Sequence, residues 1–283
     1  MNPLVSVVLS LVAWVGTMLF VAGVVIIGPR RLYDLWDGWL PRLREVRYPL
    51  AALGVVLVVS AVGRGALADL SRIVGFRLTG LIYAIEGDFV AWIQATFVVP
   101  ELTMYFSWVY VYGYVFLLVF PFIAYAALPK SAMLKRLIVA YALNYGIGLI
   151  IYTLVFAHGP RNIEAATSLL YTYNPDYQAL TTEVNEYTNV FPSLHTSLAV
   201  TAAVFGVLTR KEYPLWAPLA GWLALSVVIA TMYLGIHWLI DVIGGVALAL
   251  GSVALAYRLI DSGDASVETE GGSESDEGST SAD

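Results

Sequence analysis

Residues 215–257 read LWAPLAGWLALSVVIATMYLGIHWLIDVIGGVALALGSVALAY, and this stretch decides the fold of the chain. A continuous helix of that length would measure about 65 Å at ~1.5 Å per residue, twice the roughly 30 Å hydrocarbon core of a bilayer. The stretch must therefore turn back on itself, and Gly235 is the residue that tolerates such a turn. The sequence predicts two membrane-spanning helices here, at about residues 215–234 and 238–258.

The composition of the whole chain agrees with this interpretation. The 283 residues are 59% hydrophobic and 13% charged, with a mean hydropathy of +0.76, whereas soluble domains carry roughly 25% charged residues. We therefore expect an integral membrane protein of the all-α class, a polytopic transmembrane helical bundle of about six or seven spans. The other apolar runs lie at about 4–27, 47–62, 105–127, 137–156 and 192–209, and the run at 47–62 is the weakest.

The formal net charge of −6 is distributed very unevenly. The last 23 residues contain eight acids and no Lys or Arg, while the other 260 residues balance all 15 Lys and Arg against 13 acids. We infer three regions: N-terminal spans with an interfacial amphipathic segment at 63–104 (residues 1–104), a membrane core (105–260) and a disordered acidic tail (261–283). The weakly charged core excludes a nucleic-acid partner, and the chain has no Cys for disulfides or thiol chemistry.

The basic residues predict the orientation of the spans. If every run crosses the membrane, eleven Lys and Arg fall on one side and four on the other, which is a positive-inside pattern. We expect a cell-membrane protein with its N-terminus outside and its acidic tail in the cytoplasm. The eleven are Arg30, Arg31, Arg42, Arg44, Arg47, Lys130, Lys135, Arg136, Arg210, Lys211 and Arg258, and the four are Arg64, Arg72, Arg77 and Arg161.

All three histidines, His158, His195 and His237, fall on the predicted outer side. The first of two informative motifs is Phe-Pro-Ser-Leu-His at 191–195, where Pro192 and Ser193 are typical of a helix start. A helix N-terminus with free N–H groups attracts anions. The alternative is a capped helix end with a partly buried histidine.

The second motif is His237-Trp-Leu-Ile-Asp241, at the start of the last span. Residues four apart share a helix face, so the carboxylate can bind one ring nitrogen of the histidine and leave the other free. A carboxylate inside a membrane helix is costly without a partner, which favours such a pair. The alternative is a structural pair that only neutralises itself.

Arg161 follows the fourth long span and is the only base in the outer loop at 157–191. Its forked guanidinium suits phosphate, although it could also contact lipid headgroups. Together, these pieces favour phosphoryl transfer through a phosphohistidine: His237 attacks phosphorus, Asp241 stabilises its imidazole, and His195 protonates the leaving oxygen. Arg161 and Ser193 would bind the phosphoryl oxygens.

The chain resembles the type-2 phosphatidic acid phosphatase (PAP2) superfamily over about residues 105–258. The family motif P-S-G-H matches residues 192–195 except for Leu194, and the motif S-R-x5-H-x3-D matches at His237 and Asp241, with Ala230 and Thr231 in place of Ser and Arg. The motif K-x6-R-P is replaced by Pro160-Arg161. With these departures, the two histidine motifs resemble those of the inositol phosphorylceramide synthase subgroup.

The resemblance implies a PAP2-like core and a metal-independent phosphatase or phosphotransferase with no cofactor. It implies His237 as nucleophile and His195 as general acid, a lipid phosphate as substrate, and Arg161 as the main positive charge because the third motif lacks its Arg. The sequence leaves open hydrolysis or headgroup transfer, the lipid and the oligomeric state. We expect the outer-loop tyrosines to form an interfacial aromatic belt; they are Tyr171, Tyr173, Tyr177 and Tyr187.

Three other classes of protein are weighed against this interpretation. A transporter or proton relay would also place His and Asp in spans, but usually near the midplane. A seven-helix retinal protein needs a Lys inside a span, whereas Lys130, Lys135 and Lys211 fall in loops. A zinc hydrolase needs more ligands than the His–Asp spacing supplies, and no H-E-x-x-H motif is present.

Overall fold

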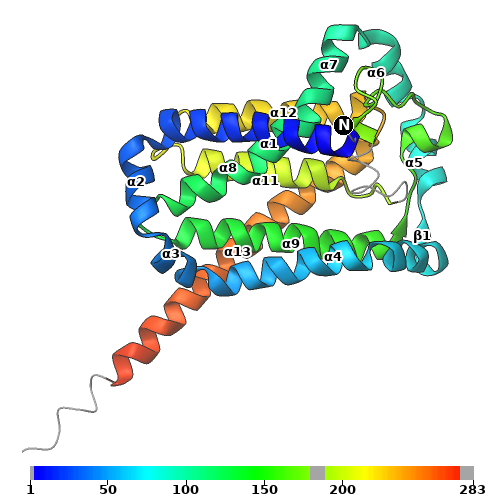
Figure 1. The fold of residues 1–283 in the computed structure, drawn as a ribbon. Coiled ribbons are helices and arrows are strands. Elements are labelled where there is room, and N and C mark those ends of the chain that lie inside the picture. Colours follow the sequence, from blue (N-terminus) through cyan, green and yellow to red (C-terminus); the bar gives the residue numbers. More distant parts are fainter. Residues whose placement is uncertain (1–2, 179–188, 275–283) are drawn as a thin grey trace, which may run out of the picture.

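The computed structural model describes residues 3–178 and 189–274, and this part of the chain is almost entirely helical. Long helices run up and down in one bundle, and short helices cover its two ends (Figure 1). The all-α polytopic bundle predicted from the composition is therefore confirmed. Its long elements are α1 (Pro3–Ala22) continued by η1 (Gly23–Ile27), α4 (Arg47–Val74), α7 (Pro100–Trp108) continued by η2 (Val109–Gly113) and α8 (Tyr114–Ala126), α9 (Ala132–Leu154), α11 (Leu194–Leu208), α12 (Trp216–Tyr233) and α13 (Leu239–Glu274).

Five of these helical segments, within the described residues, are long and apolar enough to cross a membrane. A sixth arises if α3 (Trp39–Glu45) and α4 are one span bent by 70° at their junction. The remaining apolar helix, α11, has 15 residues, about 22 Å at ~1.5 Å per residue, which is shorter than a hydrocarbon core. It is nevertheless central, since it packs against α8, α9, α12 and α13.

The break predicted at Gly235 is confirmed. Helix α12 ends at Tyr233, α13 begins at Leu239, and Gly235 between them has φ +74°. A Cβ atom at this position would lie 2.6 Å from the Thr167 carbonyl oxygen, so both the backbone conformation and the close approach require glycine. The turn sends the two long helices to different sides of α11, which packs against both α12 and α13.

The segment predicted as interfacial, 63–104, is only partly so. Helix α4 continues through it to Val74, and α7 begins within it at Pro100. The charges on α4 are accommodated near its end, where Arg72 pairs with Asp69 at 2.8 Å in exposed positions. Only the middle of the segment covers the end of the bundle, as β1 (Phe76–Arg77), α5 (Thr79–Glu86) and α6 (Phe89–Phe97).

Helix α13 extends beyond the membrane-spanning part of the chain into the acidic segment. Helix α13 continues as far as Glu274, into residues whose composition predicts disorder, and residues 275–283 lie outside the described part. Extending an existing helix adds one hydrogen bond for each residue ordered, which is far easier than starting a new helix. The membrane helix therefore supplies the start that the acidic segment lacks by itself.

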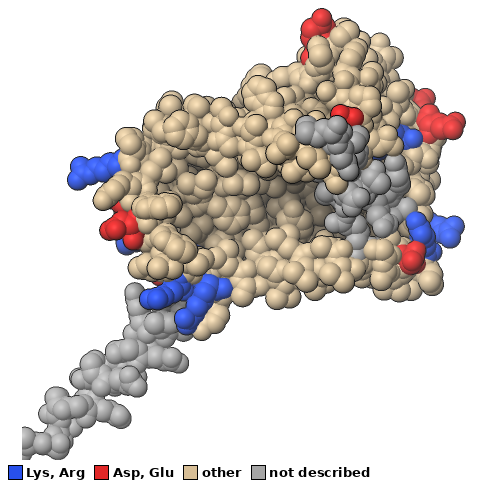
Figure 2. Space-filling view, in the orientation of Figure 1, with Lys and Arg blue, Asp and Glu red and all other residues tan. Residues whose placement is uncertain are grey.

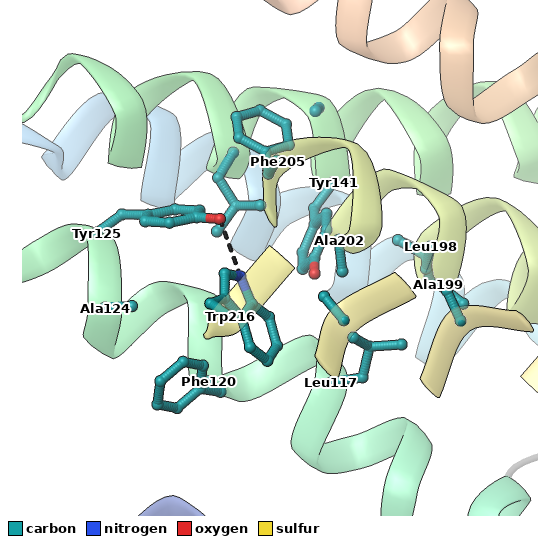
Figure 3. Packing of buried hydrophobic residues seen from close by; sticks show 14 of the residues in the cluster. Leu117, Phe120, Ala124, Tyr125, Tyr141, Leu198, Ala199, Ala202, Phe205 and Trp216 are labelled. Atoms are coloured by element: carbon teal, nitrogen blue, oxygen red, sulfur yellow. Dashed lines mark hydrogen bonds between the residues drawn. The ribbon is translucent and has the colours of Figure 1, made fainter. Parts of the chain in front are cut away.

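The core of the bundle is aromatic and fully enclosed. Phe120, Tyr125, Phe205 and Trp216 have no exposed surface, and the Trp216 indole N–H donates to the Tyr125 hydroxyl at 3.2 Å (Figure 3). A polar group in a membrane core needs such a partner because neither lipid nor water is there to supply one. Large apolar side chains on α1 and α4 point outward instead, as expected for surfaces in contact with lipid.

Charged side chains gather at the two ends of the bundle and leave an uncharged band between them (Figure 2). At one end, the Arg42 guanidinium donates to the Leu128 carbonyl, and the Arg31 guanidinium lies over the Tyr213 ring. The loops that carry most of the basic residues therefore meet at this end. Arg72, Arg77 and Arg161 belong to the opposite end, together with the histidines.

Candidate active site

The helix start predicted in the Pro-Ser-Leu-His motif is present one residue after Ser193. Ser193 is the N-cap of α11, and its hydroxyl oxygen accepts the Thr196 N–H at 3.3 Å. Pro192 precedes the cap and does not occupy the first helical position. Because the cap is a neutral hydroxyl that still has its own proton, this helix end remains able to donate to an anion.

His195 lies in the first turn of α11, between two tyrosine rings. Its ring centroid is 4.6 Å from that of Tyr110, nearly stacked, and 4.7 Å from that of Tyr114. Tyr110 lies in the π-helical turn η2 and Tyr114 is the first residue of α8, an irregularity that often occurs at functional sites. Neither tyrosine was predicted as a site residue, although their i, i+4 spacing in a tyrosine-rich run is a signal.

His237 and Asp241 form the predicted pair, but His237 is not in the helix. It lies in the turn just before α13, and its Nδ1 is 3.3 Å from Oδ2 of Asp241 in the first helical turn. The same Oδ2 accepts the Trp238 N–H at 2.9 Å. The carboxylate therefore caps the start of α13 and binds the histidine at once, which the helix-face argument did not foresee.

The two motifs are joined through the backbone. The Ser193 N–H donates to the Asp241 carbonyl at 2.9 Å, and the His195 and His237 ring centroids are 6.2 Å apart. A Cβ atom at Gly245 would lie 2.5 Å from the Ser193 carbonyl oxygen. Glycine at that position thus allows α11 and α13 to approach closely enough for the two rings to face one site.

Arg161 lies in η3 (Pro160–Ile163), in the loop after α9, and its backbone N–H donates to the Gly235 carbonyl at 3.1 Å. Its Nε and Nη1 atoms are buried and have no hydrogen-bond partner within the described residues. The side chain lines a cavity of about 600 Å³ between α6 and the loop that follows α9. Gln94, Glu164 and Thr167 also line this cavity. An unpartnered buried guanidinium can bind an anion without first breaking an ion pair.

The charge of Arg161 acts on His237, the candidate nucleophile. Burial and this charge lower the pKa of His237 to about 3, and the Val190 carbonyl acts in the opposite direction. Deprotonation of an imidazole leaves a ring nitrogen with a free electron pair. His237 is therefore neutral near pH 7, as a nucleophile requires.

Glu86, at the end of α5, is a residue of the site that the sequence analysis missed. Its two carboxylate oxygens accept the Leu239 N–H at 2.8 Å and the Ile240 N–H at 3.1 Å. Burial raises the pKa of Glu86, these two N–H groups lower it, and the nearby Asp241 raises it further. Nothing in the local sequence could reveal contacts to residues more than 150 positions away.

The other candidates lie around the site. His158 contributes its carbonyl, which accepts the Trp238 indole N–H at 2.9 Å, and its ring packs on Phe156. Tyr177 is buried and packs on Tyr112, and Tyr171 packs against the same cluster, unlike an exposed belt. Tyr173 is exposed, and Tyr187 lies outside the described residues. No group of three potential metal ligands is found among the described residues.

A comparison with protein families identifies the class of protein. A family model described as the PAP2 superfamily matches residues 80–255, well over half of the chain. The chain therefore belongs to the PAP2 superfamily, whose membership suggests activity of the phosphatase or phosphotransferase type. The match begins earlier than the resemblance at 105–258 and includes α5 and α6, and hence Glu86. Searches of curated proteins and of solved structures find no significant match.

Proposed function

We propose that this protein is a membrane-embedded lipid phosphatase or phosphotransferase that acts through a phosphohistidine intermediate on His237. One observation carries the proposal: the His237 ring, bound at Nδ1 by Asp241, lies 6.2 Å from the His195 ring and near Arg161, whose Nε and Nη1 have no hydrogen-bond partner among the described residues. A neutral nucleophile, a proton donor and a cation around one space are what transfer of a phosphoryl group needs.

The first chemical step forms a nitrogen–phosphorus bond. Because Asp241 binds Nδ1, the other ring nitrogen of His237 attacks phosphorus, and the bond from phosphorus to the leaving oxygen breaks. His195 gives a proton to that oxygen, and the anionic phosphoryl group beside it stabilises the imidazolium from which the proton comes. Ser193 and Arg161 bind the remaining phosphoryl oxygens, which carry the developing charge.

The second step reverses the roles of the two groups. A water molecule or a lipid alcohol attacks phosphorus, His195 accepts the proton of the attacking oxygen, and the nitrogen–phosphorus bond breaks to restore neutral His237. Water gives hydrolysis, and an alcohol gives a new phosphate ester, as in headgroup transfer of the inositol phosphorylceramide synthase type. Chemistry at His237 is the same for both outcomes.

The shape and charge of the molecule support the proposed substrate class and its side of the membrane. The uncharged face is hollowed between α1 on one side and α4 and α9 on the other (Figure 2, with the helices located in Figure 1). An uncharged hollow in the face between the two charged ends suits the acyl chains of a lipid whose phosphate lies at the membrane surface. Since basic residues concentrate at the opposite end, the positive-inside pattern supports a site facing outside and a cytoplasmic tail.

A transporter or proton relay is the competing function. The position of His195, His237 and Arg161 at helix ends favours an enzyme, because relay groups usually lie deeper in the membrane. The two functions differ in whether a covalent intermediate forms, and that difference is measurable.

The test uses purified full-length protein in detergent, a ³²P-labelled lipid phosphate and a chelator. We expect turnover that continues in chelator and a labelled, acid-labile protein adduct after rapid denaturation. His237→Ala should lose both turnover and adduct. His195→Ala should lose turnover because the leaving oxygen can no longer be protonated. Glu101→Gln, which changes an exposed acid at the same end of the bundle, is the control.

Turnover that survives in His237→Ala would remove the phosphohistidine mechanism. Products separate the remaining alternatives: free phosphate identifies hydrolysis, and labelled ester formed from an added lipid alcohol identifies transfer. Movement of an intact lipid or of protons across vesicles, without any adduct, would support the competing function.

A further inference from the structure

Helix α5 lies across the two loops that carry the proposed chemistry. At its start, the Thr79 hydroxyl oxygen accepts the His158 N–H at 2.9 Å, close in sequence to Arg161. At its end, Glu86 accepts the Leu239 and Ile240 N–H groups, directly after His237. Between these points, the Tyr83 ring packs edge-on against fully buried Trp238, with centroids 6.0 Å apart. One short helix therefore contacts both loops.

The start of α13 depends on this external support. The first N–H groups of a helix have no partner within it, and they are usually satisfied by a neighbouring side chain. Here, the Trp238 N–H donates to Asp241, and the next two N–H groups donate to the Glu86 carboxylate. Without Glu86, two of these three donors would lose their partner in a partly buried place, at a cost that favours fraying.

We propose that Glu86 is a positioning residue for His237, an inference that rests on the proposed function. The imidazole is attached to the first turn of α13 through the Asp241 carboxylate. When that turn frays, Asp241 and His237 move together, and the attacking nitrogen leaves its place relative to a phosphate bound by Ser193 and Arg161. Glu86 thus fixes the nucleophile without touching the substrate.

The charge of Glu86 acts in the same direction. A carboxylate at a helix N-terminus interacts favourably with the helix dipole. An amide at this position keeps one acceptor oxygen but loses the charge and the second acceptor, so Glu86→Gln and Glu86→Ala remove the support in two grades.

The experiment measures pre-steady-state kinetics of wild type, Glu86→Gln and Glu86→Ala, with Glu101→Gln as the exposed-acid control. The burst amplitude counts competent sites, and the burst rate constant reports phosphoryl transfer to His237. We expect the rate constant to fall about 10-fold in Glu86→Gln and about 100-fold in Glu86→Ala, because small misplacements of reacting groups have effects of this size. Amplitude, and competitive inhibition by inorganic phosphate, should stay within twofold of wild type.

A fall in amplitude with an unchanged rate constant would overturn the proposal, since Glu86 would then only keep the protein folded. Amide hydrogen exchange of a peptide covering 234–242 is measured in parallel and needs no substrate. We expect exchange at Leu239 and Ile240 to accelerate at least 10-fold in Glu86→Ala, and unchanged exchange would refute the support of α13. If wild type forms no phosphoenzyme, the proposed function fails, while the exchange result still decides whether Glu86 orders the helix start.

Discussion

The two helix starts at this site, those of α11 and α13, use opposite chemistry. Helix α11 begins with the neutral hydroxyl of Ser193, which leaves the positive end of the helix open. Helix α13 begins with N–H groups that donate to the carboxylates of Asp241 and Glu86. An anion is attracted to the first and repelled by the second. The difference supports the proposal that the start of α11 binds the phosphate and that the start of α13 orients the group that attacks it.

The largest effect is expected from Asp241→Asn, which removes one of the two carboxylates that accept the N–H groups at the start of α13. An amide nitrogen facing the imidazole favours the wrong tautomer, and we expect kcat to fall about 10³- to 10⁴-fold, as in orienting acids of triads. Initial rates with a lipid phosphate measure this, and Asp69→Asn, at an exposed position, should behave as wild type. A loss smaller than 10-fold would show that Asp241 does not orient His237.

Ser193→Asp places a carboxylate at the start of α11, so that this helix start resembles that of α13. An aspartate can still cap α11, but its charge opposes the incoming phosphate and is costly at this fully buried position. We expect kcat/KM to fall at least about 100-fold, since like charges in contact cost several kcal/mol.

Ser193→Asn is the matched variant, because it caps the helix without a charge. It should retain far more activity than Ser193→Asp. Equal activity in the two variants would indicate that the start of α11 does not bind the anion.

Arg161→Lys tests the cation proposed to bind phosphate together with the start of α11. Lysine keeps the charge but lacks the planar fork that binds two phosphate oxygens. We expect KM to rise about 10- to 100-fold, the equivalent of one or two charge-assisted hydrogen bonds. Arg77→Lys, an exposed arginine at the same end of the bundle, should leave KM unchanged; if both variants behave alike, only net charge matters.

The smallest effect is expected where α13 packs closely against the start of α11. Gly245→Ala places a methyl group 2.5 Å from the Ser193 carbonyl oxygen, whereas a methyl group at Gly251 on the same helix meets nothing within 4 Å. We expect Gly245→Ala to reduce the free energy of unfolding by about 1–3 kcal/mol and Gly251→Ala to be neutral or slightly stabilising. Thermal unfolding in detergent compares them, and equal midpoints would contradict the close contact.

Residue periodicity and length predicted the elements whose causes are local. The hairpin at Gly235 follows from the length of one apolar stretch, and Ser193 follows from helix capping. The pairing of His237 with Asp241 was found from their spacing, but the geometry differs because the carboxylate reaches back from the helix to the preceding turn. Glu86 could not be predicted, since its partners are distant in sequence and only tertiary packing brings them together. The spacing of Tyr110 and Tyr114 indicates a shared helix face, but their contact with His195 arises only from tertiary packing.

The hydrogen bond from the Ser193 N–H to the Asp241 carbonyl has a consequence for how such an enzyme can diversify. Main-chain atoms set the spacing between α11, which carries His195, and the start of α13, which directly follows His237. Side-chain replacements in the surrounding loops leave that spacing intact. The part of the loop after α9 that follows Arg161 can therefore change in sequence to admit another headgroup or acceptor. A directed-evolution library confined to residues 162–178 would vary substrate preference while the reaction centre stays constant.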